Sequence, residues 1–386
     1  MPASRPLLLG GVAALAVLAP LSACAKNEKG ASDGAISVVS TAEDCTLSTD
    51  EVPSGNLVFD VENQGSQVTE FYLLADDGLR IIGEVENIGP GITRKLVVQA
   101  KEGTYVTACK PGMVGDGIRS DFTVSKGEAL AVSADVQTLL DTATDQYAAY
   151  VKDQTEQLLT QTRAFAAAYL GGRGDEARTL YPAARMHWER IEPVAESFGD
   201  LDPRLDLREA DLEEGQAWTG WHRIEKDLWP QKAEGYTAAT PAERKELADQ
   251  LVADTQELYD RTRTITFTAD QLGNGAKELL DEVATGKVTG EEEIWSGTDL
   301  WDFQANLDGA RIAFENLRPV LATKDPDLVE VLDRRFADLQ RGLDRYKKGD
   351  GFVTYSELTP AQIKTLADEV SALGEPLSKL TAAVVL

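Results

Sequence analysis

The feature that most constrains this fold is a change of hydrophobic period between residues 125 and 135. Before it, apolar residues come in short β-branched runs separated by turn sequences, a pattern typical of strands. After it, apolar residues recur every three or four positions, which is the spacing of one helix face. A sequence with one of these periods does not place its apolar side chains on one face of the other structure. We therefore predict a multidomain protein in which an all-β domain precedes an all-α domain.

The all-β domain is predicted between residues 36 and 126. Six apolar runs predict its strands, and turn sequences such as Asp76-Asp77-Gly78 and Gly89-Pro90-Gly91 separate them. Short strands at this spacing favour a β-sandwich. The six runs are 36–39, 57–61, 71–74, 95–98, 105–107 and 122–124.

The all-α domain is predicted between residues 135 and 386, as a helical bundle. Thr240-Pro241 and Thr359-Pro360 each supply a capping threonine with proline at the first helical position. Pro193 cannot donate a backbone hydrogen bond, so we expect its helix to kink there and open a concave site. The expected helices are 136–170, 175–198, 210–229, 241–282, 299–321, 328–347 and 360–384.

Residues 1–23 have the composition of a signal peptide, with Arg5 before an apolar run that is too short to span a membrane securely. The run ends in Leu21-Ser22-Ala23-Cys24, which resembles the lipobox of bacterial lipoproteins. That resemblance implies that Cys24 is lipidated and becomes the mature N-terminus. The alternative is an ordinary cleaved signal peptide. Residues 24–35 then predict a polar tether, and the protein would lie outside the cytoplasmic membrane, anchored to it by lipid.

The formal net charge of −27 makes nucleic acid an unfavourable partner. The electrostatic field of so negative a protein concentrates cations near its surface, although a large negative charge also serves solubility. No later apolar run approaches the length of a membrane span, so the chain has no sequence basis for forming a permease itself. Transport through the bilayer would need a partner.

Two cysteines, Cys45 and Cys109, remain once Cys24 is assigned to the lipid anchor. In an exported chain the default is a disulfide between them. The alternative, if the thiols stay reduced, is a soft or mixed metal site with Glu70 and Met113. A blue-copper centre within residues 36–126 is excluded, because it needs two histidines and this region contains none.

The helical domain carries two pairs of metal-capable side chains at helical spacing. His222 and Glu225 lie three residues apart, as do Glu189 and Glu192, and residues at this spacing share a helix face. Glu189 and Glu192 with Asp206 would contribute to an oxygen-rich cage of the kind that hard Fe(III) prefers, and the family resemblance described below adds Glu292 to it. His222 and Glu225 would either bind the ion themselves or hold its ligands in place. Each feature also has a simpler interpretation: a polar helix face, a solvated acidic face, or helix capping by Asp206.

Three motifs in these regions resemble known families. Gly220, His222 and Glu225 fit the Gly-x-His-x-x-Glu signature of the imelysin family. The strand order, with Cys109 to Met113 near its last turn, resembles the cupredoxins. Residues 84–91 and 289–306 are similar to stretches of the EfeO-type iron-uptake family.

Together these resemblances imply a cupredoxin-like sandwich followed by an imelysin-like helical domain. They also imply an iron-binding protein that serves a ferric permease beside a haem peroxidase, with copper or zinc as further ions.

The imelysin resemblance also implies a rival function, because that family is grouped with metallopeptidases. His187, His222 and Glu225 would supply the His2Glu set of a catalytic zinc site. However, the sequence contains no His-Glu-x-x-His motif and no identifiable general base. We therefore rank metal capture above hydrolysis. A third possibility, a scaffold without a metal, leaves the two spaced pairs unexplained.

Overall fold

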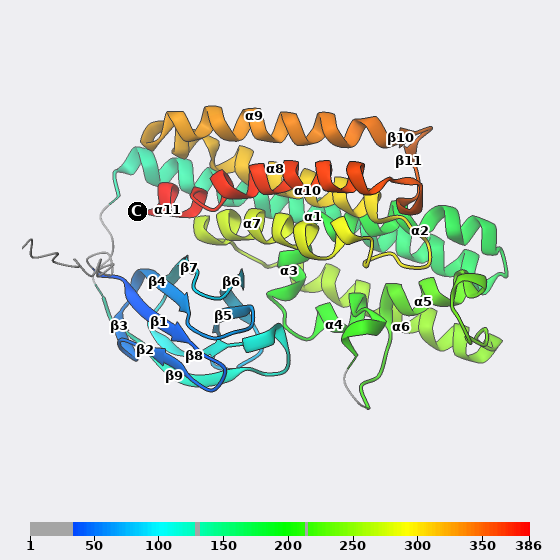
Figure 1. The fold of residues 1–386 in the computed structure, drawn as a ribbon, viewed down its shortest axis with the longest axis horizontal. Coiled ribbons are helices and arrows are strands. Elements are labelled where there is room, and N and C mark those ends of the chain that lie inside the picture. The colour runs from blue at the N-terminus through cyan, green and yellow to red at the C-terminus, as the bar shows by residue number, and fades with distance from the viewer. Residues whose placement is uncertain (1–33, 128–131, 213–214) are drawn as a thin grey trace, which may run out of the picture.

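The computed structural model describes residues 34–127, 132–212 and 215–386, which form a β-sandwich followed by a helical domain (Figure 1). The predicted signal peptide, Cys24 and nearly all of the predicted tether lie outside the described residues. The order of an all-β part and an all-α part is the one predicted.

The sandwich consists of two sheets. The first contains, in order, β2 (Cys45–Leu47), β1 (Ile36–Ser40), β4 (Gly55–Asn63) and β7 (Thr93–Ala100). The second contains, in order, β3 (Glu51–Pro53), β9 (Ile118–Ser125), β8 (Gly103–Cys109), β5 (Thr69–Leu74) and β6 (Ile81–Ile88). Neighbouring strands are antiparallel except that β1 runs parallel to β4, and β3 to β9.

All six predicted strand runs lie within observed strands, because alternate apolar side chains fill the space between the sheets. Phe59 packs against Phe71 and Phe122, with ring centroids 5.1 and 5.7 Å apart. Strands β2, β3 and β6 were not predicted, and the longest of the three is β6. It carries Glu84 and Glu86 where an apolar alternation would be expected, because this strand faces the helical domain and not only solvent.

The helical domain contains eleven α-helices within the described residues. They are α1 (Ala134–Leu170), α2 (Gly174–Glu189), α3 (Glu192–Glu196), α4 (Leu201–Asp206), α5 (Gly220–Leu228), α6 (Pro241–Thr262), α7 (Ala269–Thr285), α8 (Asp299–Lys324), α9 (Pro326–Leu343), α10 (Pro360–Leu377) and α11 (Leu380–Val385). A short hairpin, β10 (Lys347–Lys348) with β11 (Gly351–Phe352), follows α9.

Four predicted helices were wrong in extent, and one of them, expected at 360–384, is divided into α10 and α11. The helix expected at 175–198 is broken into α2 and α3, and the break begins before Pro193, which occupies the first turn of α3. The helix expected at 210–229 is confined to α5, and the one expected at 241–282 is two helices joined by residues 263–268. Apolar spacing alone did not reveal these breaks, because each new helix continues a buried face.

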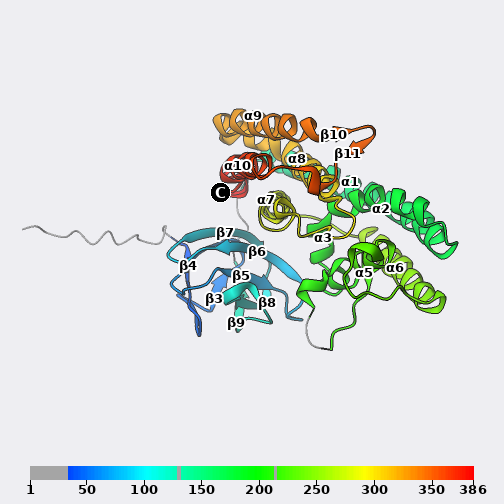
Figure 2. The ribbon, with the colours of Figure 1, turned by 45° about the vertical axis from the view of Figure 1, so that its right-hand side comes forward.

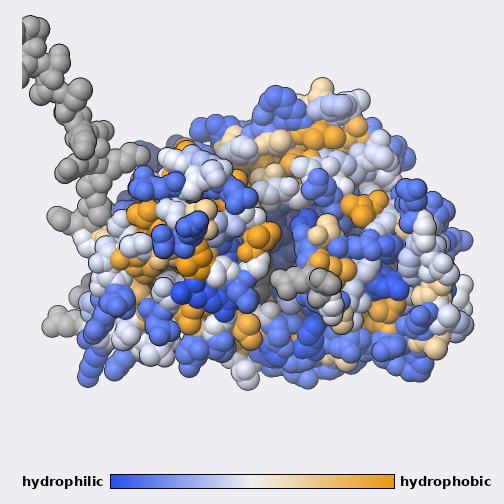
Figure 3. Space-filling model, turned by 60° about the horizontal axis from the view of Figure 1, so that its bottom comes forward, coloured by the Kyte–Doolittle hydropathy of each residue, from blue (hydrophilic) through white to orange (hydrophobic). Residues whose placement is uncertain are grey.

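The sandwich docks on α7 through hydrogen bonds between side chains and backbone. The Asn274 side-chain amide donates to the Val97 carbonyl at 3.0 Å, and the Asp270 carboxylate accepts from the Gln99 amide at 2.7 Å. Figure 2 shows β6 and β7 beneath α7. Seen from below, the molecule has a recess between the sandwich and the helices (Figure 3).

Cys45 and Cys109 form a disulfide, which was the default prediction. The alternative metal site with Glu70 and Met113 is wrong for this structure, because disulfide sulfurs are not the thiolate ligands that it would need. Glu70 instead accepts a hydrogen bond from the Tyr72 hydroxyl at 2.7 Å, and the Met113 side chain is partly exposed.

Within the part of the chain that the structure describes, no helix combines the length and the apolar composition that a bilayer crossing requires.

Candidate metal centre

All six ligands predicted in the helical domain are buried, and the fold brings them together. Glu189 ends α2, Glu192 begins α3 and Asp206 ends α4, while His222 and Glu225 lie on α5. Glu292 precedes α8. Three groups have ligand atoms within 4.8 Å of one another: Asp206, His222 and Glu292; His222, Glu225 and Glu293; and Glu189, Glu192 and Asp206.

His222 lies at the centre of the first two groups. Its Nε2 atom is 3.3 Å from carboxylate oxygens of both Asp206 and Glu292, and its Nδ1 atom is 3.5 Å from Glu225. The residue is 1% exposed, yet neither ring nitrogen has a hydrogen-bond partner of acceptable geometry among the described residues. A buried imidazole without such a partner is costly, and it is chemically suited to coordinate a cation.

Gly220 explains why the first position of the imelysin-like motif is glycine. It has a φ of +82°, and a Cβ atom there would lie 2.1 Å from the Leu205 carbonyl oxygen. Only glycine lets the start of α5 approach the end of α4 this closely. That approach sets His222 beside Asp206.

Glu225 ties α5 to the loop that carries Glu292. One of its oxygens accepts hydrogen bonds from the backbone amides of Trp295 and Ser296, at 3.0 and 2.6 Å. The other oxygen faces His222. Burial and the neighbouring Glu293 raise the pKa of Glu225 to about 7.

The charges around His222 change the pKa of its imidazole. Burial and Arg185 oppose protonation, but the Asp206, Glu225 and Glu292 carboxylates outweigh them and raise the pKa of His222 well above its usual value. A metal ion and a proton would therefore compete for this ring.

Glu189 and Glu192 are neutralised from within the protein. The Lys287 ammonium is 2.8 Å from Glu189, 3.0 Å from Glu192 and 2.9 Å from Glu282. Burial nevertheless raises the pKa of both Glu189 and Glu192, and Glu192 is raised further by its neighbour Glu189. A lysine thus occupies part of the space that the sequence prediction gave to a metal ion.

Arg185 is a second internal cation. Its guanidinium pairs with Glu189 and Asp206, and its Nε atom is 2.6 Å from Glu293. Asp302 lies 3.7 Å away and has no hydrogen-bond partner for either oxygen among the described residues. The complete cluster is a network of carboxylates, one imidazole and two cations, and all of its members except the half-buried Glu282 are buried.

The first group has access to the surface. Arg208, His222, Glu292 and Trp295 help to line a cavity of about 210 Å³. Arg208 also approaches Glu292 at 3.4 Å. Burial would raise the pKa of Glu292, but Lys287, His222 and Arg208 lower it strongly, so this carboxylate is ionised and available to a cation.

The structure does not bring His187 into the centre. Its ring nitrogens lie 2.7 and 2.8 Å from the side chains of Gln161 and Gln154, so both positions are engaged. Burial and Arg190 lower its pKa to about 4. The predicted zinc set of His187, His222 and Glu225 is therefore wrong, and this removes the main structural support for a peptidase.

Comparison with known proteins matches this two-part architecture. The family model described as imelysin matches residues 143–380, and the one described as cupredoxin-like domain matches residues 11–124. The protein named "Iron uptake system component EfeO" from Escherichia coli K12 is 36% identical over 350 residues, which cover 89% of this chain and 90% of that protein. Its namesake from Yersinia pseudotuberculosis is 36% identical over 368 residues, or 95% of each chain. The chain belongs to the EfeO family.

In this EfeO-family chain, sequence reasoning missed four charged residues of the centre: Arg185, Lys287, Glu293 and Asp302. Arg185 lies four residues before Glu189, so helical spacing could have predicted that pair. The burial of Lys287 has no comparable local signal, because its three partners lie on α2, α3 and α7. Only the packed fold reveals that the cage contains its own cations.

Proposed function

We propose that this protein is the extracytoplasmic iron-binding component of an EfeUOB-type transport system, which captures iron and delivers it to a ferric permease. The observation that carries the proposal is the group of Asp206, His222 and Glu292, which is buried beside a cavity and in which neither imidazole nitrogen makes a hydrogen bond of acceptable geometry with a described residue. The name of the relatives, iron uptake system component, supports it. The protein would act as a binding protein and not as an enzyme.

The donor set favours iron over softer ions. Two carboxylates and one imidazole form the first group, and further carboxylates stand behind it. Carboxylate oxygens suit hard Fe(III), while the imidazole also accepts Fe(II), zinc and copper. Lys287 and Arg185 offset the negative charge of the cluster, so that the folded protein without iron does not contain a fully uncompensated set of buried carboxylates.

Partners follow from the resemblance to the EfeO-type systems. A ferric permease would receive the ion, and a haem peroxidase would act beside it. The permease would lie in the membrane, where a lipid on Cys24 would hold this protein.

Titration of the mature full-length chain tests the iron-binding proposal. We expect one equivalent of Fe(III) to bind tightly at the helical centre. Zn(II) and Cu(II) should compete for the same site with lower affinity. Calorimetry with a chelator-buffered iron supply measures the stoichiometry and the affinity of iron binding. If none of the three ions binds stoichiometrically, the proposed function is wrong.

The lipid anchor has its own test. Cys24→Ala is expected to move the protein from the membrane fraction into the soluble extracytoplasmic fraction, because one lipidated cysteine is the only anchor that the sequence predicts. Cell fractionation and immunoblotting measure the distribution, with the Cys45→Ala/Cys109→Ala double variant, which leaves no unpaired thiol, as the control for loss of cysteines that are not the anchor. Continued membrane attachment of the Cys24→Ala protein would show that something else anchors the chain.

A further inference from the structure

Lys287 is a buried lysine whose ammonium lies among the candidate ligands of the helical centre. The residue is 1% exposed, and its Nζ atom is 2.8 Å from Glu189, 3.0 Å from Glu192 and 2.9 Å from Glu282. An ammonium has three N–H donors, and three carboxylate oxygens at these distances engage all of them. The Lys287 ammonium therefore lies where a metal ion would, inside a shell of carboxylate oxygens.

Two of the three candidate groups share one residue. Asp206 belongs to the group with His222 and Glu292 and also to the group with Glu189 and Glu192. Two cations bound by these groups would share the Asp206 carboxylate and lie close together. Helical bundles build two-ion sites from glutamates and histidines that project from facing helices. The side chains of this centre would therefore suit two ions, and not only one.

Lys287 is fixed in the second of these groups by the connection between α7 and α8. It begins the 3-10 helix η4 (Lys287–Thr289), and its carbonyl accepts a hydrogen bond from the Gly290 amide at 3.3 Å. The Tyr355 hydroxyl donates to the carbonyl of the next residue, Val288. The ammonium is part of the chain, so it does not exchange with ions in solution. It would repel a metal ion placed beside it in a medium that screens poorly.

Arg185, the other internal cation, does not fill this position. It pairs with the Oε1 atom of Glu189, whereas Lys287 contacts the Oε2 atom of the same carboxylate. Lys287 also contacts Oε2 of Glu192. Burial opposes the charge of Lys287, but its carboxylate partners outweigh burial and raise the pKa of the ammonium well above its usual value. Lys287 therefore stays positively charged near neutral pH.

We propose that Lys287 is a resident cation that fills the second ion position of the helical centre and so restricts the centre to one iron ion. It supplies the positive charge that Glu189 and Glu192 would otherwise draw from a metal. The group of Asp206, His222 and Glu292 is left as the position for the captured ion. This role rests on the proposed function. With one ion in each molecule, release of the iron does not require breaking a carboxylate bridge to a second ion.

Mn(II) binding to the mature full-length chain tests this role. Electron paramagnetic resonance counts the bound Mn(II) and also detects two Mn(II) ions that are close enough to couple. We expect one uncoupled equivalent in the wild type. Lys287→Met removes the ammonium but keeps an unbranched side chain, and it should bind two equivalents and show the coupled signal. Adding Glu192→Gln should weaken the second equivalent at least about tenfold, as loss of a metal-site partner commonly does.

Lys277→Met is the matched control, since Lys277 pairs with Asp281 of the same helix, α7. It should bind one uncoupled equivalent, as the wild type does. If Lys287→Met folds poorly, Lys287→Met/Glu282→Gln replaces it, because this variant loses one negative charge together with the positive one and keeps both Glu189 and Glu192. One uncoupled equivalent, or none, in the Lys287 variants overturns the resident-cation role.

His222→Ala added to Lys287→Met separates this role from the proposed function. The protein with both changes should keep one Mn(II) equivalent that depends on Glu192, because the position vacated by Lys287 does not use His222. Loss of that equivalent counts against the resident cation. Its presence, in a protein whose wild type binds no iron, would support the role of Lys287 while refuting the proposed function.

Discussion

His222→Ala is expected to lower the affinity of the mature protein for iron by at least about 100-fold, the upper range seen when even an indirect metal-site partner is lost. His222 supplies the only imidazole of the three candidate groups and belongs to two of them. Its replacement leaves Asp206 and Glu292 facing a gap without the nitrogen that holds them around one ion. Competition against a chelator of known iron affinity measures the loss.

His187→Ala is the control for this prediction. His187 is the other histidine of the chain, but its ring contacts Gln154 and Gln161 and not the centre. We expect the iron affinity of the His187→Ala protein to stay within about threefold of the wild-type value, since a residue remote from the site adds little to binding. Equal losses in both variants would show that the iron site does not depend on the Asp206, His222 and Glu292 group.

The sequence predicted which acidic side chains and which imidazole the fold brings together better than it predicted the balance of charge among them. Glu189, Glu192, His222 and Glu225 follow from helical spacing, because residues three apart share a face whatever the fold around them. Asp206 and Glu292 rested on the family resemblance, and the structure places both beside His222. Lys287 could not be predicted from local pattern, since its partners come from three helices brought together only by packing.

The same distinction holds for the fold. Strands with alternating apolar residues were predicted, whereas β6 was missed because Glu84 and Glu86 occupy positions that face another domain. Helix existence was predicted well, but the ends of α5, α6 and α7 were not, because apolar periodicity persists where the backbone turns. The positions where the apolar periodicity fails to predict the fold thus lie around the metal centre and in the space between the two domains.

Arg185→Met is expected to destabilise the helical domain by about 3–5 kcal/mol, the usual cost of removing one partner from a buried ion pair. The fully buried guanidinium contacts Glu189, Asp206 and Glu293, and methionine would fill much of its volume without its charge. At neutral pH those carboxylates would then repel one another in a medium that screens poorly. Thermal unfolding should show a midpoint lower by roughly 10 °C or more.

The loss of stability caused by Arg185→Met should become smaller as the pH falls. Burial and Glu189 already raise the pKa of Asp302, while Arg185 acts to lower it, so removing Arg185 raises this folded-state pKa further. A group whose pKa is higher in the folded state stabilises the fold at low pH and loses that contribution as the pH rises through the folded-state value. The stability difference between Arg185→Met and the wild type should therefore be smaller at pH 5 than at pH 8.

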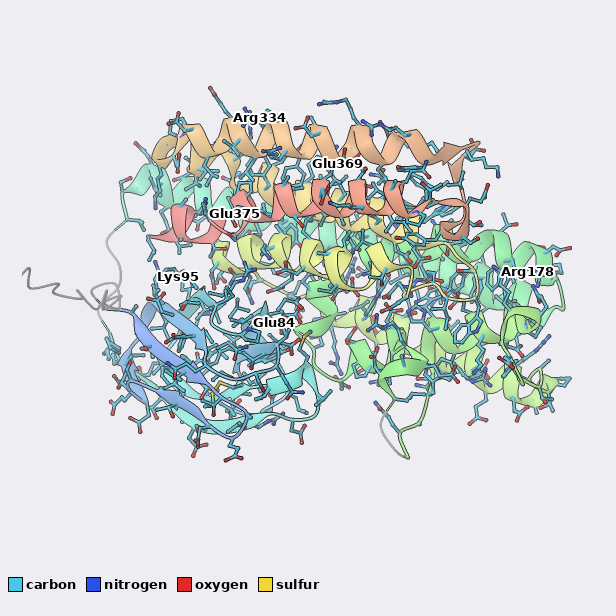
Figure 4. All side chains as sticks on the ribbon, viewed as in Figure 1. Glu84, Lys95, Arg178, Arg334, Glu369 and Glu375 are labelled. Atoms are coloured by element: carbon cyan, nitrogen blue, oxygen red, sulfur yellow. A yellow bond between two sulfur atoms is a disulfide. The ribbon has the colours of Figure 1, made fainter. Side chains whose placement is uncertain are left out.

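Arg334→Met separates this effect from a general loss of arginine. Arg334 is exposed on α9 and makes no ion pair among the described residues (Figure 4). Its replacement should change stability by no more than about 0.5 kcal/mol at either pH, as surface substitutions usually do. If Arg185→Met were as stable as Arg334→Met at pH 8, the buried carboxylates would not need their internal cation. The cluster would then hold protons in place of charge, and its capacity to bind iron near neutral pH would have to be reconsidered.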